Sequence, residues 1–218
     1  MASRIFREFI QGFRALYEVG PCVTVFGSAR YEESHPYYEL GRELGAGLAR
    51  AGFTVMTGGG PGLMEAANRG AQEVGGHSLG SNIQLTHEEQ PNPYLDSFVQ
   101  FKYFFVRKVM LAKYSYAFVS LPGGYGTLDE LFEIATLIQT HKMRDFPCVI
   151  MGREYYKPLL DFLSGTLVRE GAIDQADFDR LIVTDSAEEA VEHIREAAIR
   201  KFGLHYVERA RQRPNGPV

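Results

Sequence analysis

Two glycine-rich clusters are the residues of this sequence best suited to hold an anion. Their sequences are TGGGPG at residues 57–62 and PGGYGT at residues 122–127, and a shorter turn, GSAR, spans residues 27–30. Each follows an apolar, strand-like run, and each of the two clusters precedes a helix-like run. Glycine lets the backbone approach a ligand closely, and the free N–H groups at a helix start favour a negative group. The alternative is that these glycines only form tight strand-to-helix turns.

The spacing within the clusters narrows the choice of anion. The phosphate-loop pattern GxxxxGK[ST] is absent, because no lysine follows either cluster at that distance. The dinucleotide pattern GxGxxG also fails, since Gly124-Tyr125-Gly126 has no third glycine and the second strand ends without an acid for a ribose hydroxyl. ATP hydrolysis and NAD chemistry are therefore disfavoured, and a nucleoside monophosphate or a sugar phosphate remains.

Three charged residues could supply the chemistry beside such a cradle. Arg107 and Lys108 lie in an otherwise apolar run, FFVRKVMLAKY. Burying a charge among apolar side chains costs free energy unless the charge points into a polar site, so these two cations are candidates for a ligand site. The alternative is that the pair faces solvent at the surface. Glu130 stands three residues after Thr127, a spacing that also fits a helix capping box. An arginine that holds a ligand, and a carboxylate that grips ribose hydroxyls or stabilises an oxocarbenium-like centre, suit glycosidic-bond cleavage.

Alternating strand-like and helix-like runs position these residues. Apolar runs predict strands over residues 22–27, 53–57, 77–85, 97–101, 116–121, 147–151 and 181–184, and periodic runs predict helices over residues 36–51, 63–74, 105–115, 128–140, 155–170 and 186–202. Strands that are apolar throughout and separated by helices predict a mostly parallel sheet with helices on both faces. We therefore expect a single Rossmann-like three-layer α/β domain over residues 1–218, with its core over residues 21–202.

The two ends of the chain are expected to lie outside this core. Residues 1–20 carry large apolar side chains at helical spacing with charges between them, which predicts an extra amphipathic helix. These side chains are Phe6, Phe9, Phe13 and Leu16 or Tyr17. We expect this helix to pack on its own domain or on a neighbouring subunit. Residues 203–218 are polar, contain two prolines and are expected to form a frayed tail.

Composition disfavours several classes of protein. The chain has 23 basic and 27 acidic residues, and its formal charge of −4 disfavours a nucleic-acid coating protein. The two cysteines, Cys22 and Cys148, are too few for a disulfide framework, lack CxxC spacing and are interpreted as buried thiols. No apolar run approaches the roughly 18 residues of a membrane span, and the N-terminus does not resemble a secretory signal. We expect no membrane partner and a cytoplasmic location.

Taken together, the motifs resemble those of the LOG ("lonely guy") family. PGGYGTLDE at residues 122–130 resembles its PGGxGTxxE signature, TGGGPGLMEAAN at residues 57–68 is similar to its GGGxxGLM segment, and GSAR matches its opening turn. The likeness runs from about Cys22 to Met151. It implies a Rossmann-like fold and a homo-oligomer, either a dimer or an assembly of dimers. It also implies hydrolysis of nucleoside 5′-monophosphates, such as AMP or cytokinin riboside monophosphate, to free base and ribose 5-phosphate.

The resemblance also assigns roles to individual residues. Arg107 and Glu130 match the family's catalytic pair, and Lys108 matches its partner cation. The substrate and phosphate contacts fall on Gly123, Gly124, Tyr125, Gly126, Thr127, Gly59, Gly60, Ser28, Glu89 and Thr136. Arg107, Lys108 and the helix N-termini are expected to make the pocket locally cationic. Neither a metal nor a cofactor is expected: members are often called lysine decarboxylases, but no lysine is marked out for pyridoxal phosphate.

The arginine segment departs from the family pattern MHxRKxxM, because Phe105 replaces the histidine and Leu111 replaces the second methionine. This departure is compatible with hydrolysis but weakens the case for prenylated adenine as the base. The N-terminal helix and the loop at residues 92–94 resemble the longer-chain bacterial branch of the family. Two alternatives stay open. One is a non-catalytic carrier of a nucleotide or phosphate ligand, as in the similar molybdenum-cofactor carrier group, and the other is a scaffold that works through its N-terminal helix.

Overall fold

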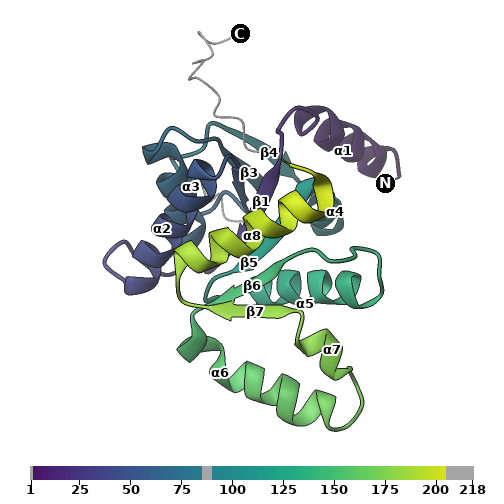
Figure 1. Cartoon of the computed structure of the whole chain (residues 1–218). Helices are drawn as coiled ribbons and strands as arrows, with labels where there is room; N and C mark the ends of the chain where they lie inside the picture. The colour runs from purple at the N-terminus through teal and green to yellow at the C-terminus, as the bar shows by residue number, and fades with distance from the viewer. Residues whose placement is uncertain (1, 85–89, 205–218) are drawn as a thin grey trace, which may run out of the picture.

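A parallel sheet forms the centre of the molecule. The computed structural model describes residues 2–84 and 90–204, and within them seven parallel strands lie in the order β4-β3-β2-β1-β5-β6-β7 (Figure 1). The strands are β1 (Cys22–Phe26), β2 (Thr54–Thr57), β3 (Ser78–Ile83), β4 (Ser97–Phe101), β5 (Ser115–Ser120), β6 (Cys148–Met151) and β7 (Leu181–Thr184). The predicted Rossmann-like sheet is confirmed.

The strand order places the three glycine turns side by side. The chain runs from β1 outward to β4 and then returns to β5 on the other side of β1. Val23 of β1 is accordingly paired with Val55 of β2 on one side and with Ala117 of β5 on the other. Ligands of open α/β sheets bind outside the carboxyl ends of the strands, where the strand order reverses. In this sheet that point is the boundary between β1 and β5.

Helices cover both faces of the sheet (Figure 1). One face is covered by α2 (Pro36–Arg50), α3 (Leu63–Glu73) and α8 (Ala187–Phe202), and the other by α1 (Ala2–Ala15), α4 (Phe104–Tyr114), α5 (Tyr125–Gln139) and α6 (Arg153–Phe162). A π-helical segment (Leu163–Val168) continues α6, and a short helix, α7 (Gln175–Phe178), precedes β7. Each face has its own apolar core, so the three-layer prediction is also confirmed.

Strand β1 shows how the sequence builds both cores at once. Val23 joins the core beneath α2 and α3, whereas its neighbour Cys22 joins the core beneath α4 and α5. Between the apolar residues, the buried hydroxyl of Thr24 hydrogen-bonds that of Ser115 at 2.6 Å. Burial raises the pKa of the Cys22 thiol to about 12, so it stays protonated. Cys148 is likewise a free, buried thiol, and both cysteines are structural as predicted.

Several element bounds differ from the sequence prediction. Helix α5 begins at Tyr125 and not at the predicted Leu128. Gly126 is tolerated in its first turn, because the N–H groups of that turn need no intrahelical partner. The predicted capping box of α8 is half formed. The Ser186 hydroxyl accepts from the backbone N–H of Glu189 at 3.1 Å, but the Glu189 carboxylate accepts from the Thr184 hydroxyl. Helix α7 was not predicted, and the helix predicted after β6 is divided between α6 and the π-helical segment.

The predicted N-terminal helix is present, and Phe9 and Phe13 pack against the core beneath α4 and α5 as expected. Phe6 is 68% exposed and Tyr17 is 81% exposed, whereas Gly12 and Leu16 are buried. The apolar stripe is therefore confirmed at Phe9, Phe13 and Leu16 and wrong at Phe6, because the buried Gly12 marks the line along which α1 approaches the protein. No described helix is long and apolar enough to cross a membrane. The predicted tail lies outside the described residues from position 205 onward.

The contact between α2 and α3 depends on a glycine. A Cβ atom added to Gly70 would overlap the backbone carbonyl oxygen of Arg42, which cannot rotate away. We expect Gly70→Ala to lower the free energy of unfolding by about 1–3 kcal/mol, the usual cost of overpacking. Gly165→Ala is the control, because a Cβ there meets nothing within 4 Å, and it should change stability by less than about 1 kcal/mol. Urea unfolding measures both, and equal stabilities would contradict this account of the contact.

Candidate functional site

The three glycine turns are joined directly at Ser28. Its backbone N–H donates to the carbonyl of Pro122 at 3.0 Å, which ties the turn after β1 to the turn after β5. Its carbonyl accepts from the backbone N–H of Leu63 at 2.9 Å, which ties the same turn to the start of α3. A Cβ on Gly62 would overlap this carbonyl, so the close approach of the turns requires glycine there. The carboxyl edge of the sheet is therefore one connected backbone surface.

A network of buried side chains holds the TGGGPG turn. The Thr57 hydroxyl donates to Oδ1 of Asn68 at 2.6 Å and accepts from the backbone N–H of Gly59 at 2.9 Å. The Asn92 amide donates to Oδ1 of Asn68 and to the carbonyl of Gly60, both at 3.0 Å. Because buried polar groups are costly when unpaired, this network fixes the path of the turn. Asn68 and Asn92 lie in segments that carry the family resemblance, but sequence reasoning gave neither a structural role, since an asparagine carries no local signal for one.

The PGGYGT turn opens helix α5 without a side-chain cap. Gly124 is its N-cap residue, so the first N–H groups of the helix have no acceptor from a capping side chain. Space is open where a Cβ would lie on Gly124 or Gly126, whereas a Cβ on Gly123 would overlap the buried side chain of Thr127. Tyr125 is 94% exposed. An open, uncapped helix start at the carboxyl edge of the sheet is suited to an anion.

Arg107 and Glu130 contact each other across helices α4 and α5. Nη2 of Arg107 donates to Oε1 of Glu130, and each side chain is only 12% exposed. Burial raises the pKa of Glu130 above its ordinary value, while the nearby charge of Arg107 opposes the shift. Nε of Arg107 is buried without a partner among the described residues. The surface-facing alternative for Arg107 is therefore wrong, and so is the capping box, because Glu130 reaches α4 and not the start of its own helix.

Lys108 pairs with two carboxylates of α5. Its ammonium lies 3.0 Å from Asp129 and 2.8 Å from Glu133. Burial lowers the pKa of Lys108, but the two carboxylates outweigh burial and the net shift is upward. Together with the Arg107 pair, two cations face three carboxylates. The expectation that these side chains make the site locally cationic is therefore wrong. The helix starts remain as the source of positive potential.

The other predicted contacts lie in different places. Ser28, Gly59 and Gly60 lie in the connected turns, as described above. Thr136 is exposed on α5, about 9 Å along the helix axis from Glu130, and its hydroxyl donates to the carbonyl of Phe132 at 2.7 Å. The structure thus does not bring Thr136 to the Arg107–Glu130 pair. Glu89 lies outside the described residues.

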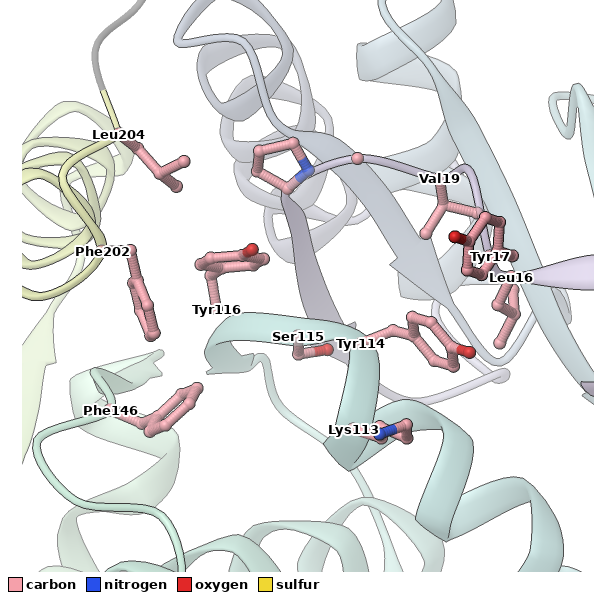
Figure 2. A pocket seen from close by; sticks show the side chains of 12 residues that line it. Leu16, Tyr17, Val19, Lys113, Tyr114, Ser115, Tyr116, Phe146, Phe202 and Leu204 are labelled. Atoms are coloured by element: carbon pink, nitrogen blue, oxygen red, sulfur yellow. The ribbon is translucent and has the colours of Figure 1, made fainter. Parts of the chain in front are cut away.

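A cavity of about 520 Å³ lies at the opposite edge of the sheet (Figure 2). It is lined by residues before β1, around the start of β5 and at the end of α8, among them Leu16, Val19, Lys113, Tyr116, Phe146 and Phe202. These positions are at the amino ends of the strands, away from the glycine turns. The cavity is therefore separate from the candidate site. Within residues 2–84 and 90–204, no group of three His, Cys, Asp or Glu side chains is arranged to hold a metal.

These features define a class of protein. The chain is a Rossmann-like α/β protein whose strand order reverses beside an uncapped helix start, with a buried arginine–carboxylate pair on the neighbouring helices.

Comparison with known proteins identifies the family. The profile of a family described as "possible lysine decarboxylase" matches residues 64–194. A cytokinin riboside 5′-monophosphate phosphoribohydrolase of Rhodococcoides fascians is 32% identical, over 79% of this chain and 88% of the relative. A protein of the same name from Mycobacterium tuberculosis is 33% identical, over 70% of this chain and 82% of the relative. The chain belongs to the LOG family of phosphoribohydrolases, as its motifs predicted.

Solved structures support the fold. The molybdenum cofactor carrier protein of Chlamydomonas reinhardtii matches with a TM-score of 0.59 at 21% identity, over 81% of this chain and 97% of that chain. The molybdenum cofactor binding protein of Rippkaea orientalis matches with a TM-score of 0.58 at 22% identity, over 81% and 96%. At these identities the likeness concerns the fold alone.

The open space at Gly126 gives a direct test of the cradle. Alanine is the better helix former, so Gly126→Ala should leave the free energy of unfolding unchanged or raise it by up to about 1 kcal/mol. The added methyl group should nevertheless weaken binding of AMP, because it occupies space that the protein leaves open. Gly123→Ala is the comparison variant in the same turn. It should lower the stability of the fold, because the added Cβ would overlap the side chain of Thr127. Thermal unfolding and calorimetric titration measure both effects, and undiminished AMP affinity in Gly126→Ala would place the phosphate elsewhere.

Proposed function

We propose that this protein hydrolyses the N-glycosidic bond of nucleoside 5′-monophosphates, AMP or cytokinin riboside monophosphate, to free base and ribose 5-phosphate. The observation that carries the proposal is the buried Arg107–Glu130 pair beside the uncapped start of α5. The names of the relatives from Rhodococcoides fascians and Mycobacterium tuberculosis point to the same substrate class.

The start of α5 suits the 5′-phosphate. Its first-turn N–H groups lack a capping side chain, and the positive end of the helix dipole favours a doubly charged group. Glu130 lies on the same helix, only five residues beyond Tyr125, where the helix begins. A phosphate bound at Tyr125–Thr127 therefore places the attached ribose toward the carboxylate of Glu130.

Glu130 is the group that acts on the ribose. When the bond between C1′ and the base breaks, its electron pair leaves with the base and positive charge develops at C1′. The Glu130 carboxylate stabilises that charge, or holds the ribose hydroxyls so that the ring can flatten. One water molecule then adds to C1′, and its proton balances the charge on the departing base.

Arg107 favours the ionised form of Glu130, although burial outweighs it and the net shift of the Glu130 pKa is upward. Burial alone would favour the neutral acid, which could not stabilise a cation, and the charge of Arg107 opposes this effect on the Glu130 pKa. The pair thus joins a carboxylate and a guanidinium in one buried contact beside the start of α5.

Replacing either partner of the pair should slow catalysis strongly while the protein still folds. We expect Glu130→Gln and Arg107→Ala each to lower kcat for base release by on the order of 10²–10³-fold, because each removes a charge that acts in the transition state. The matched control is the exposed pair of Arg195 and Glu192, 2.8 Å apart on α8, whose Arg195→Ala and Glu192→Gln variants should retain wild-type rates.

Chromatography after incubation with AMP and its N6-substituted forms measures the released base, and circular dichroism checks folding. Wild-type rates in both Glu130→Gln and Arg107→Ala would contradict this assignment of the site. Nucleotide that the wild-type protein binds but leaves intact would support the non-catalytic carrier instead.

We also propose that the protein is a homo-oligomer, built through the outer surface of α4 and α5. This surface exposes Phe104 (55%), Phe105 (48%), Val109 (41%) and Phe132 (39%). Clustered exposed apolar side chains are typical of protein interfaces. A second copy of this chain presents the same apolar residues and so could cover them by two-fold pairing.

A charge on this surface should separate the subunits. We expect Phe105→Asp to shift the sedimentation coefficient from that of an oligomer to that of a monomer, because a carboxylate cannot be buried in an apolar interface without a partner. Tyr17→Asp is the control, since Tyr17 is equally an exposed aromatic residue but lies at the other edge of the sheet. A wild-type protein that sediments as a monomer at micromolar concentration would overturn the oligomer proposal.

A further inference from the structure

The helix that carries Arg107 has no cap of its own. Tyr103 is the N-cap residue of α4, its side chain makes no capping hydrogen bond, and the first turn contains no acidic residue. A carboxylate from helix α1 instead binds the two residues that lead into this helix. Oε2 of Glu8 accepts from the backbone N–H groups of Lys102 and Tyr103, both at 3.2 Å. A carboxylate at this place satisfies free donors and complements the positive end of the α4 dipole.

Helix α1 holds α4 at further points (Figure 1). At Gly12 the two helices approach so closely that a Cβ would lie 2.9 Å from the sulfur of Met110. At the other end of α4, the Tyr114 hydroxyl donates to the carbonyl of Phe13 at 3.3 Å, and the Lys113 ammonium lies 5.8 Å from the Phe13 ring. In Figure 2 the Tyr114 side chain projects toward Leu16, which follows α1 in the sequence. Helix α4 is therefore fixed along its whole length by α1.

The Glu8 cap and Arg107 belong to one hydrogen-bonded turn. The peptide N–H of Tyr103 donates to Glu8, and the carbonyl of Tyr103 accepts from the backbone N–H of Arg107 at 3.2 Å. Arg107 in turn contacts Glu130. A continuous chain of polar contacts thus runs from Glu8 through Tyr103 and Arg107 to the carboxylate proposed to act on the ribose.

We propose that Glu8 is a positioning residue of the active site, which fixes the first turn of α4 so that Arg107 meets Glu130. The proposal rests on the function proposed above and gives the N-terminal helix a role in that reaction. Without the Glu8 carboxylate, the first turn of α4 loosens and Arg107 contacts Glu130 for less of the time. The phosphate cradle lies on other turns and is unaffected.

Loss of this positioning has a characteristic kinetic signature. Since the phosphate cradle is intact, KM for AMP should change by less than about twofold, whereas kcat should fall roughly tenfold, because small misplacements of a catalytic group are costly. Arg107 lowers the pKa of Glu130, so a looser contact lets that pKa rise. Activity that needs the carboxylate is lost as the pH falls through this pKa. The acid limb of the pH–rate profile should therefore move to higher pH.

The test compares Glu8→Ala and Glu8→Gln with the wild type. Glutamine keeps an oxygen acceptor but no charge, so it should recover part of kcat and part of the shift in the acid limb. The control is Gln11→Ala, which changes an exposed residue of the same helix and should match the wild type. Hydrogen exchange of the backbone amides at residues 103–107 should be faster in Glu8→Ala and unchanged in Gln11→Ala.

The outcomes separate this proposal from the proposed function. Suppose that the wild-type protein is active and that Glu8→Ala keeps the wild-type kcat and acid limb. Glu8 would then be only a structural cap, and this proposal would be overturned while the proposed function stands. A wild-type protein that releases no base would overturn both. If Glu8→Ala fails to fold, the same comparison is made with Glu8→Gln, whose side chain keeps the shape of the original.

Discussion

The buried contact between Arg107 and Glu130 is the constraint on which the arrangement of the carboxyl edge depends. It joins α4, which follows the edge strand β4, to α5, which follows β5 on the far side of β1. Removing one partner of a buried ion pair typically costs about 3–5 kcal/mol, so each side chain holds the other in place. Helix α4 connects β4 to β5 and so already crosses this face of the sheet, and the contact fixes its position against α5. Helix α1, packed along α4, makes that crossing rigid.

Features that repeat along the chain could be predicted from the sequence. Apolar runs separated by helix-like runs predicted the parallel sheet. Glycine clusters after the strands predicted the turns, which the structure joins at Ser28. Prediction was weaker where local rules allow two outcomes. Tyr125-Gly126-Thr127 has the composition of a loop, but it forms the first turn of helix α5. The N–H groups of a first helical turn have no intrahelical acceptor, so this turn tolerates residues that are poor helix formers. Thr127 and Glu130 have capping-box spacing, but the long-range contact with Arg107 takes the carboxylate.

The residues that could not be predicted act across long sequence separations. Glu8 lies between Phe6 and Phe9, where a charge is normally expected to face solvent, yet it meets backbone N–H groups 94 and 95 positions away. Asn92 lies in a loop and fixes a turn 32 positions earlier through the carbonyl of Gly60. Glu8 belongs to no short motif, and the loop at residues 92–94 indicated a branch of the family but no role for Asn92. Their roles depend on which elements the fold brings together, and single-sequence patterns do not carry that information.

The pairing of Arg107 and Lys108 with carboxylates changes the account of how an acidic protein would bind a phosphate. Arg107 and Lys108 each contact carboxylates, so neither offers a free positive charge to a ligand. Attraction must then come from the backbone, namely the uncapped start of α5 and the glycine turns that let a ligand approach it. Backbone donors have fixed directions, whereas lysine side chains are flexible. A site built in this way binds a phosphate in one orientation, which is what a reaction at the attached ribose requires.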